Sequence, residues 1–136
     1  MKSRDTLVRL RRFQCEEKRR RVLQIETMIG EFNRMTGDLG REIAAEEQRA
    51  RISDVTHFAY PTYARAARVR RDNLASSVDD LRNQLEDAKA ALAEAQAELG
   101  KAETMEGRDK GAERPPEPVR DRAASRLVGM GAAAPR

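Results

Sequence analysis

Residues 74–102, which read LASSVDDLRNQLEDAKAALAEAQAELGKA, decide the fold of this chain. An uncharged seam recurs in them at alternating steps of four and three residues. The seam consists of Leu74, Val78, Leu81, Leu85, Ala88, Leu92, Ala95, Leu99 and Ala102. More than three heptads without a stutter are typical of a coiled coil. The pattern therefore predicts a long helix, and Ala67, Ala64 and Tyr60 continue its phase backward.

A second heptad seam precedes it. This seam consists of Val8, Cys15, Val22, Ile25, Ile29, Phe32, Leu39 and Ile43, with Thr36 in the slot between Phe32 and Leu39. The spacing predicts another long helix, over residues 4–50. Each glycine inside a helix costs about 1 kcal/mol relative to alanine. Because Gly30, Gly37 and Gly40 fall within it, we expect this helix to be weakest between residues 30 and 40.

The two seams are separated by a break and followed by a tail. Pro61 fits the first turn of a helix but not its interior, so we predict a break over 51–60 and a second helix over 61–106. Residues 107–136 hold four of the five prolines and four of the eight glycines, which predicts disorder. Two helices joined by a short break usually fold back on each other. The predicted fold is all-α, an antiparallel two-helix coiled-coil hairpin over 1–106 with a disordered C-terminal tail.

Composition and charge support this fold class. Of 136 residues, 37% are charged and 4% are aromatic, which is too little bulky apolar material for a β-sandwich, a barrel or an α/β sheet. Residues 1–22 carry nine basic and three acidic side chains, whereas residues 79–106 carry eight acidic and three basic ones. An antiparallel hairpin with residue 7 opposite about residue 104 brings these segments together. A parallel dimer of either segment would stack like charges.

The chain offers little for catalysis. His57 is the only histidine and Cys15 the only cysteine, and the sequence has no phosphate-binding loop, dinucleotide-binding glycine motif or zinc-protease motif. We therefore predict no enzyme, no catalytic residues, no cofactor and no metal. A single cysteine suits a reducing cytoplasm, and no apolar run approaches the roughly 18 residues of a membrane span.

Two groups of residues remain as candidate binding surfaces. The first is a basic cluster formed by Arg9, Arg11, Arg12, Lys18, Arg19, Arg20 and Arg21. This cluster is either a solvated face that pairs with the acidic second helix, a surface for an acidic protein, or, least favoured, a nucleic-acid site, which would need interleaved aromatics. The second group is Phe58, Tyr60 and Tyr63, which either close the seam or form a docking spot.

Several segments resemble alphaproteobacterial members of the FliJ family of flagellar export proteins. They are MKSRDTLVRLRRFQ at 1–14, EKRRR at 17–21, EIAAEE at 42–47, ISD at 52–54, HFAYPTYA at 57–64, RDNL at 71–74 and LEDAKAAL at 85–92. The resemblance covers about residues 1–106, and the Gly/Pro tail departs from it. The part around His57–Tyr63 lies outside the heptads and is the most specific.

The resemblance implies a non-enzymatic component of the flagellar type III protein export apparatus that supports flagellar assembly, motility and chemotaxis. Family members form an antiparallel coiled-coil stalk, similar to the stalk subunit of rotary ATPases. The stalk docks into the ring of the export ATPase and contacts the cytoplasmic domain of the export gate membrane protein, and export chaperones are further partners. The implied location is cytoplasmic, peripheral at the cytoplasmic face of the cell membrane and without insertion into it.

The resemblance also divides the candidate surfaces between the two partners. The contacts expected on the ATPase side are Arg9, Arg12, Phe13, Arg19 and Arg20. The contacts expected on the gate side are Phe58, Tyr60 and Tyr63. The alternative hypotheses are a basic coiled-coil nucleic-acid-binding protein and a generic secretion chaperone.

Overall fold

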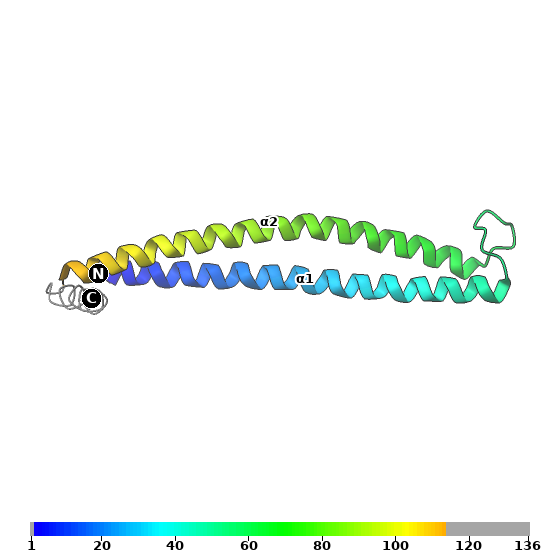
Figure 1. Ribbon diagram of the computed structural model, residues 1–136, viewed down its shortest axis with the longest axis horizontal. Helices are drawn as coiled ribbons and strands as arrows, with labels where there is room; N and C mark the ends of the chain where they lie inside the picture. Colours follow the sequence, from blue (N-terminus) through cyan, green and yellow to red (C-terminus); the bar gives the residue numbers. More distant parts are fainter. Residues whose placement is uncertain (1, 114–136) are drawn as a thin grey trace, which may run out of the picture. The chain divides into compact units, whose positions relative to one another are not determined.

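Two long helices make up the fold (Figure 1). The computed structural model describes residues 2–113, in which α1 spans Lys2–Ala50 and α2 spans Thr62–Glu113. No strand occurs among these residues, and α2 runs back antiparallel to α1. The predicted all-α, two-helix hairpin is therefore confirmed.

The helix boundaries differ from prediction mainly at the end of α2. Pro61 lies just before this helix, and its carbonyl oxygen accepts a hydrogen bond from Arg65 N at 3.0 Å. The helix continues to Glu113, so the predicted end at residue 106 was wrong. Residues 107–113 contain two glycines but no proline, and glycine weakens a helix without removing a backbone donor. The rest of the predicted tail, 114–136, lies outside the described residues.

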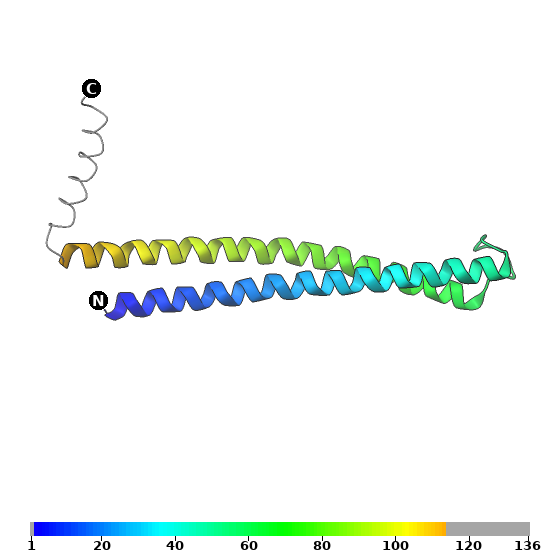
Figure 2. The same ribbon diagram turned by 60° about the horizontal axis from the view of Figure 1, so that its bottom comes forward.

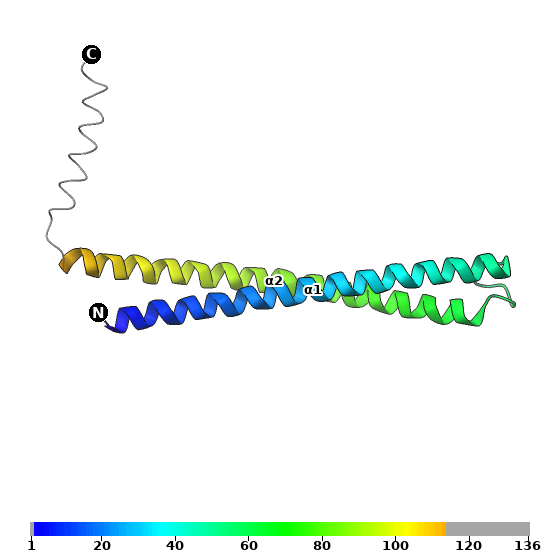
Figure 3. The same ribbon diagram turned by 90° about the horizontal axis from the view of Figure 1, so that it is seen from below.

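The chain divides into two compact units. Unit 1 combines Met1–Arg12 with Ala97–Arg136, and unit 2 is Phe13–Gln96. In unit 1 the blue start of α1 lies beside the yellow-to-orange end of α2 (Figure 1). In unit 2 the cyan part of α1 and the green part of α2 cross each other (Figures 2 and 3), as expected of a supercoiled pair.

The core follows the two heptad seams. The buried hydrophobic residues among those described are Val8, Cys15, Val22, Ile25, Leu39, Ile43, Tyr60, Ala64, Ala67, Val78, Leu81 and Ala102. Each of them occupies a predicted seam position. The glycine-containing stretch between residues 30 and 40 is helical throughout. Leu85, Leu92 and Leu99 lie on the same seam but are only half-buried, because two helices alone cannot enclose every layer.

The end of α1 is defined by a backbone motif. Arg51 has a φ of 59°, in the left-handed region. Arg51 N donates to Gln48 O at 3.3 Å, and Ile52 N donates to Glu47 O at 3.2 Å. These are the two hydrogen bonds of a Schellman motif, in which the residue after the helix is usually glycine. Ile52 then packs against the core, so this motif fixes where the chain leaves α1.

Candidate partner-binding surfaces

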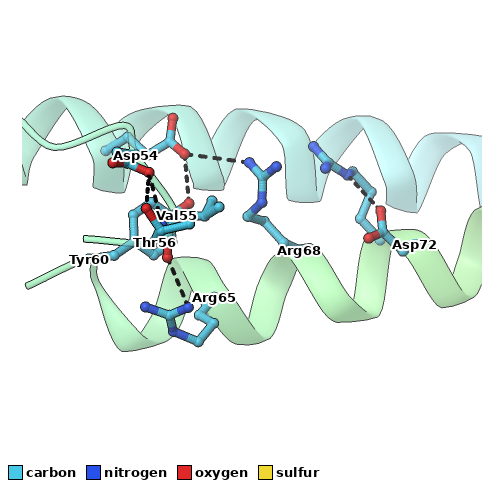
Figure 4. A network of polar contacts seen from close by, with 9 residues as sticks. Asp54, Val55, Thr56, Tyr60, Arg65, Arg68 and Asp72 are labelled. Atoms are coloured by element: carbon cyan, nitrogen blue, oxygen red, sulfur yellow. Dashed lines mark hydrogen bonds and ion pairs between the residues drawn. The ribbon is translucent and has the colours of Figure 1, made fainter. Parts of the chain in front are cut away.

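The loop between the helices is built by short-range hydrogen bonds (Figure 4). Asp54 Oδ1 accepts from Thr56 N at 2.9 Å and from Thr56 Oγ1 at 2.7 Å. Ala59 N donates to His57 Nδ1 at 2.9 Å, and Tyr60 N donates to His57 O at 3.0 Å. His57, the only histidine, therefore has a structural role in shaping the loop.

Tyr60 belongs to the core rather than to the surface. Its side chain is 4% exposed and packs with Leu39, Ile43, Ala64 and Ala67. We call these five residues the loop-end cluster, and Ile52, Val55 and Leu74 pack against it. Of the two readings of the aromatics that the sequence left open, closing the seam is the one that the structure shows for Tyr60.

Glu47 connects Tyr60 to α2. The Tyr60 hydroxyl donates to Glu47 Oε2 at 2.6 Å, and Arg68 Nη1 lies 3.6 Å from the same oxygen (Figure 4). The guanidinium of Arg65 lies 5.3 Å from the centroid of the Tyr60 ring, and its Nη1 donates to Val55 O at 3.1 Å. A single carboxylate thus joins the loop, α1 and α2.

Phe58 and Tyr63 are exposed, unlike Tyr60. Phe58 is 95% exposed, and its ring stacks on the His57 ring with centroids 4.9 Å apart. Because the loop hydrogen bonds hold His57, Phe58 is presented to solvent from an ordered turn. Tyr63 is half-exposed, and its hydroxyl donates to the Glu42 carboxylate on α1. Two of the three predicted gate-side residues are therefore accessible to a partner.

Three ionisable groups near the loop have pKa values that are shifted by their surroundings. Burial raises the pKa of Tyr60, and its hydrogen bond to the Glu47 carboxylate raises it further. The hydrogen bond to the Glu42 carboxylate raises the pKa of Tyr63. Hydrogen bonds from Thr56 lower the pKa of Asp54. Both tyrosines are therefore held as neutral hydroxyl donors, and Asp54 is held as an acceptor.

Unit 1 shows the predicted pairing of basic and acidic segments. Arg4 Nε lies 3.5 Å from Asp109 Oδ2, Arg11 Nη2 lies 3.9 Å from Glu98 Oε1, and Arg12 Nη2 lies 3.3 Å from Glu103 Oε2. These pairs agree with the predicted register, which placed residue 7 opposite about residue 104. Arg9, a predicted ATPase contact, is exposed and has no hydrogen-bond or ion-pair partner among the described residues.

In unit 2 the other three predicted ATPase contacts lie on exposed parts of α1. Phe13 is 55% exposed, and Arg20, seven residues later, shares its face of the helix and has no partner within the described part of the chain. Arg19 Nη1 pairs with Glu16 Oε2 at 3.0 Å on its own helix. Nearby, Arg21 Nη2 donates to Gln84 Oε1 at 3.3 Å. The exposed phenylalanine and the unpaired Arg20 are thus the parts most available to a partner.

Sequence reasoning missed the partners of the tyrosines. Glu42 and Glu47 read as ordinary flanking charges, and nothing in their spacing marks them as hydrogen-bond acceptors. The signal that could have found them is register, since an antiparallel pair places residues 42 and 63 opposite each other.

The described residues contain no group of His, Cys, Asp and Glu that could hold a metal ion. Neither described helix is long and apolar enough to span a membrane.

A comparison of the chain with models of known protein families, with curated proteins and with solved structures found no match.

Proposed function

We propose that this protein is a non-enzymatic component of the flagellar type III protein export apparatus, a coiled-coil stalk that links the export ATPase ring to the export gate. The proposal rests on the resemblance of residues 1–106 to the FliJ family, and an antiparallel two-helix hairpin is the fold that this resemblance implies. The observation that carries it furthest is the segment around His57–Tyr63. Its first residues, 57–59, precede the heptads, and they belong to an ordered loop that presents Phe58 at 95% exposure.

The available side chains support a division of contacts between two partners. Arg9, Phe13 and Arg20 are exposed, and both arginines lack partners among the described residues, which suits them to an acidic surface on the ATPase. Phe58 and Tyr63 suit an apolar pocket on the cytoplasmic domain of the gate, because aromatic side chains are frequent binding anchors. Tyr60 contributes indirectly, by holding the loop.

Nucleic-acid binding has less support as an alternative. Arg4, Arg11 and Arg12 each lie against a carboxylate of α2, which would repel phosphates. A mobility-shift titration with duplex DNA at low salt tests this alternative, since phosphate contacts give binding that weakens steeply with salt.

The first test is a binding and activity assay with the purified export ATPase. We expect a complex and a higher rate of ATP hydrolysis on addition of the protein. Arg20→Glu should weaken the complex about tenfold, because it places a like charge against an acidic surface. Arg34→Glu is the matched control, since Arg34 is also exposed on α1 but lies outside the basic cluster. Equal effects of both variants would reject the assigned surface.

The second test addresses the gate and the cell. Phe58→Ala should lower affinity for the cytoplasmic domain of the gate about tenfold or more, as expected for an aromatic anchor that becomes buried in the complex. Val69→Ala removes another exposed apolar side chain and should leave affinity unchanged.

Deletion of the gene should abolish or reduce motility. Normal flagella in a clean deletion strain would overturn the proposed function.

A further inference from the structure

The two flanks of the seam in unit 2 differ in polarity. The first, which we call the methionine flank, consists of Gln14, Arg21, Met28, Met35 and Glu42 on α1 and Tyr63, Arg70, Ser77, Gln84 and Ala91 on α2. The second, the charged flank, consists of Arg19, Glu26, Asn33, Gly40 and Glu47 on α1 and Arg68, Ala75, Arg82, Lys89 and Gln96 on α2. Three of ten positions are charged on the methionine flank and six of ten on the charged flank.

Contacts confirm that each flank joins the two helices. On the methionine flank, Arg21 donates to Gln84 at 3.3 Å and Tyr63 donates to Glu42. On the charged flank, Arg68 pairs with Glu47 at 3.6 Å. The heptad assignment therefore holds in three dimensions, and the methionine flank is a continuous face along both helices of unit 2.

Methionine is unexpected at these exposed positions. Met28 and Met35 are 38% and 37% exposed, and both occupy the heptad position just before the seam. A helix with apolar residues on the seam and on one flank is typical of a bundle of more than two helices. Val69 occupies an outer position singly, and single exposures are ordinary, whereas Leu23 lines a depression together with Met28. Met28 and Met35 thus leave an apolar stretch of the methionine flank uncovered in the described structure.

We propose that the methionine flank binds a second copy of this chain, giving a symmetric antiparallel four-helix bundle. Charge supplies the argument for this occupant and orientation. The sequence midpoint of the pair Met28 and Met35 lies between residues 31 and 32. The pair Arg21 and Glu42 has the same midpoint. A two-fold axis through that point, perpendicular to the helices, places Met28 opposite Met35 and Arg21 opposite Glu42 of the second copy. A parallel arrangement would instead place Arg21 against Arg21.

The shape of the flank agrees with this arrangement. A shallow depression on it is lined by Met35, Asp38, Leu39, Glu42, Tyr63 and Arg70. The two-fold axis brings residues 35–42 against residues 21–28 of the second copy, so Met28 of the second copy lies at the depression. Methionine side chains adapt well to irregular gaps of this kind. Because Tyr63 lines this depression, the second copy and the proposed gate contact compete for that side chain.

Sedimentation equilibrium of the full chain tests the proposal directly. We expect the mass to rise from 15.3 kDa toward twice that value at concentrations up to about 100 µM. A mass of 15.3 kDa throughout this range would overturn the proposal, and so would an assembly that continues to grow beyond two copies.

A matched pair of variants locates the interface. Met35→Glu should weaken the dimer about tenfold or more, because it buries a charge between copies. Asn33→Glu lies two residues away on the charged flank and should leave the dimer unchanged. Both positions are exposed, so circular dichroism should show parental helicity for each. Equal effects of the two variants on mass would reject the methionine flank.

A charge exchange tests the orientation. Arg21→Glu and Glu42→Arg should each weaken the dimer about tenfold, because each affects two symmetry-related pairs. The double variant should restore the parental dimer, since it re-forms both pairs with the charges exchanged. A double variant as weak as the single variants would reject the antiparallel arrangement.

Discussion

The loop end of unit 2 and the described part of unit 1 hold α1 against α2 by different means. The loop-end cluster buries Leu39, Ile43 and Tyr60 beside two alanines, and the Glu47 carboxylate ties it to both helices. Among the described residues of unit 1 the buried hydrophobic side chains are Val8 and Ala102, and three partly exposed ion pairs flank them. One region relies on apolar burial, and the other relies mainly on charge.

This difference predicts an unequal distribution of stability. Burying a large aliphatic or aromatic side chain contributes about 1.5–3 kcal/mol, whereas an exposed ion pair contributes about 0.2–1 kcal/mol. Regions with few buried apolar contacts open locally at low free energy. We therefore expect unit 1 to open and close while the loop end stays folded. The ion pairs then serve mainly to select the antiparallel register.

The largest expected effect comes from a charge in the seam. Leu81 is 6% exposed, and Leu81→Asp puts an unpaired carboxylate into the core, at a cost we expect to exceed about 4 kcal/mol. Helicity measured by circular dichroism should fall sharply. Leu92→Asp, at a half-buried seam position, should retain more helicity than Leu81→Asp. Full helicity in the Leu81 variant would refute the register of the seam.

Truncation of one buried side chain in each region tests the comparison directly. Ile43 and Val8 are both 3% exposed. Ile43→Ala removes packing from the loop-end cluster and should lower the free energy of unfolding by about 3 kcal/mol. Val8→Ala should speed amide hydrogen exchange near the chain start while leaving the urea midpoint almost unchanged. Equal shifts of the urea midpoint would show that the two regions unfold together.

Alkaline pH should weaken the loop end. The neutral hydroxyls of Tyr60 and Tyr63 donate to carboxylates, and the pKa of each is raised in the folded chain. This contribution to stability is complete below the ordinary tyrosine pKa of 10.0 and is lost as pH rises through the raised folded value.

Absorbance at 295 nm, followed in the single variants Tyr60→Phe and Tyr63→Phe, assigns each titration. A folded chain whose two tyrosines both titrate at the ordinary value would contradict the hydrogen bonds to Glu42 and Glu47.

A stabilising change is expected where α1 ends. Arg51 adopts a left-handed φ of 59°, which costs a residue with a side chain about 1 kcal/mol relative to glycine. Arg51→Gly should therefore raise the free energy of unfolding by about 0.5–1 kcal/mol. Gln48→Gly, in the last turns of α1, is the control and should lower it by a similar amount. A destabilised Arg51→Gly would mean that the side chain contributes more than the backbone strain costs.

Much of the fold could be predicted from the sequence, because heptad spacing reports directly on which residues face a partner helix. The buried positions Ile25, Val78 and Leu81 were all on the predicted seams. The end of α2 could not be predicted, since Gly107 only weakens a helix and gives no fixed stop. The motif at Arg51 was equally hidden, because its usual marker is glycine.

The candidate surfaces were predicted less completely than the fold. Composition picked out Phe58, Tyr60 and Tyr63 together, yet Tyr60 is buried and the other two are exposed. Tyr60 continues the phase of the seam, whereas Tyr63 lies on its flank and Phe58 in the loop. The position of a residue relative to the heptad seam therefore distinguishes core from surface here, whereas residue type does not. The acceptors of the two tyrosine hydroxyls depend on long-range register, which a single charge on a helix flank does not reveal.

The smallest expected effect concerns the ion pairs of unit 1. Glu103→Gln removes the charge that faces Arg12 at 3.3 Å, and both side chains are about half-exposed. The free energy of unfolding should fall by no more than about 0.5 kcal/mol, and the difference should vanish in about 1 M salt, where exposed charges are screened. Urea titrations at low and high salt measure both quantities. A larger, salt-resistant loss would mean that charge stabilises unit 1 as firmly as burial stabilises the loop end. The two regions would then differ in the kind of interaction that holds α1 against α2 but not in the stability that it provides.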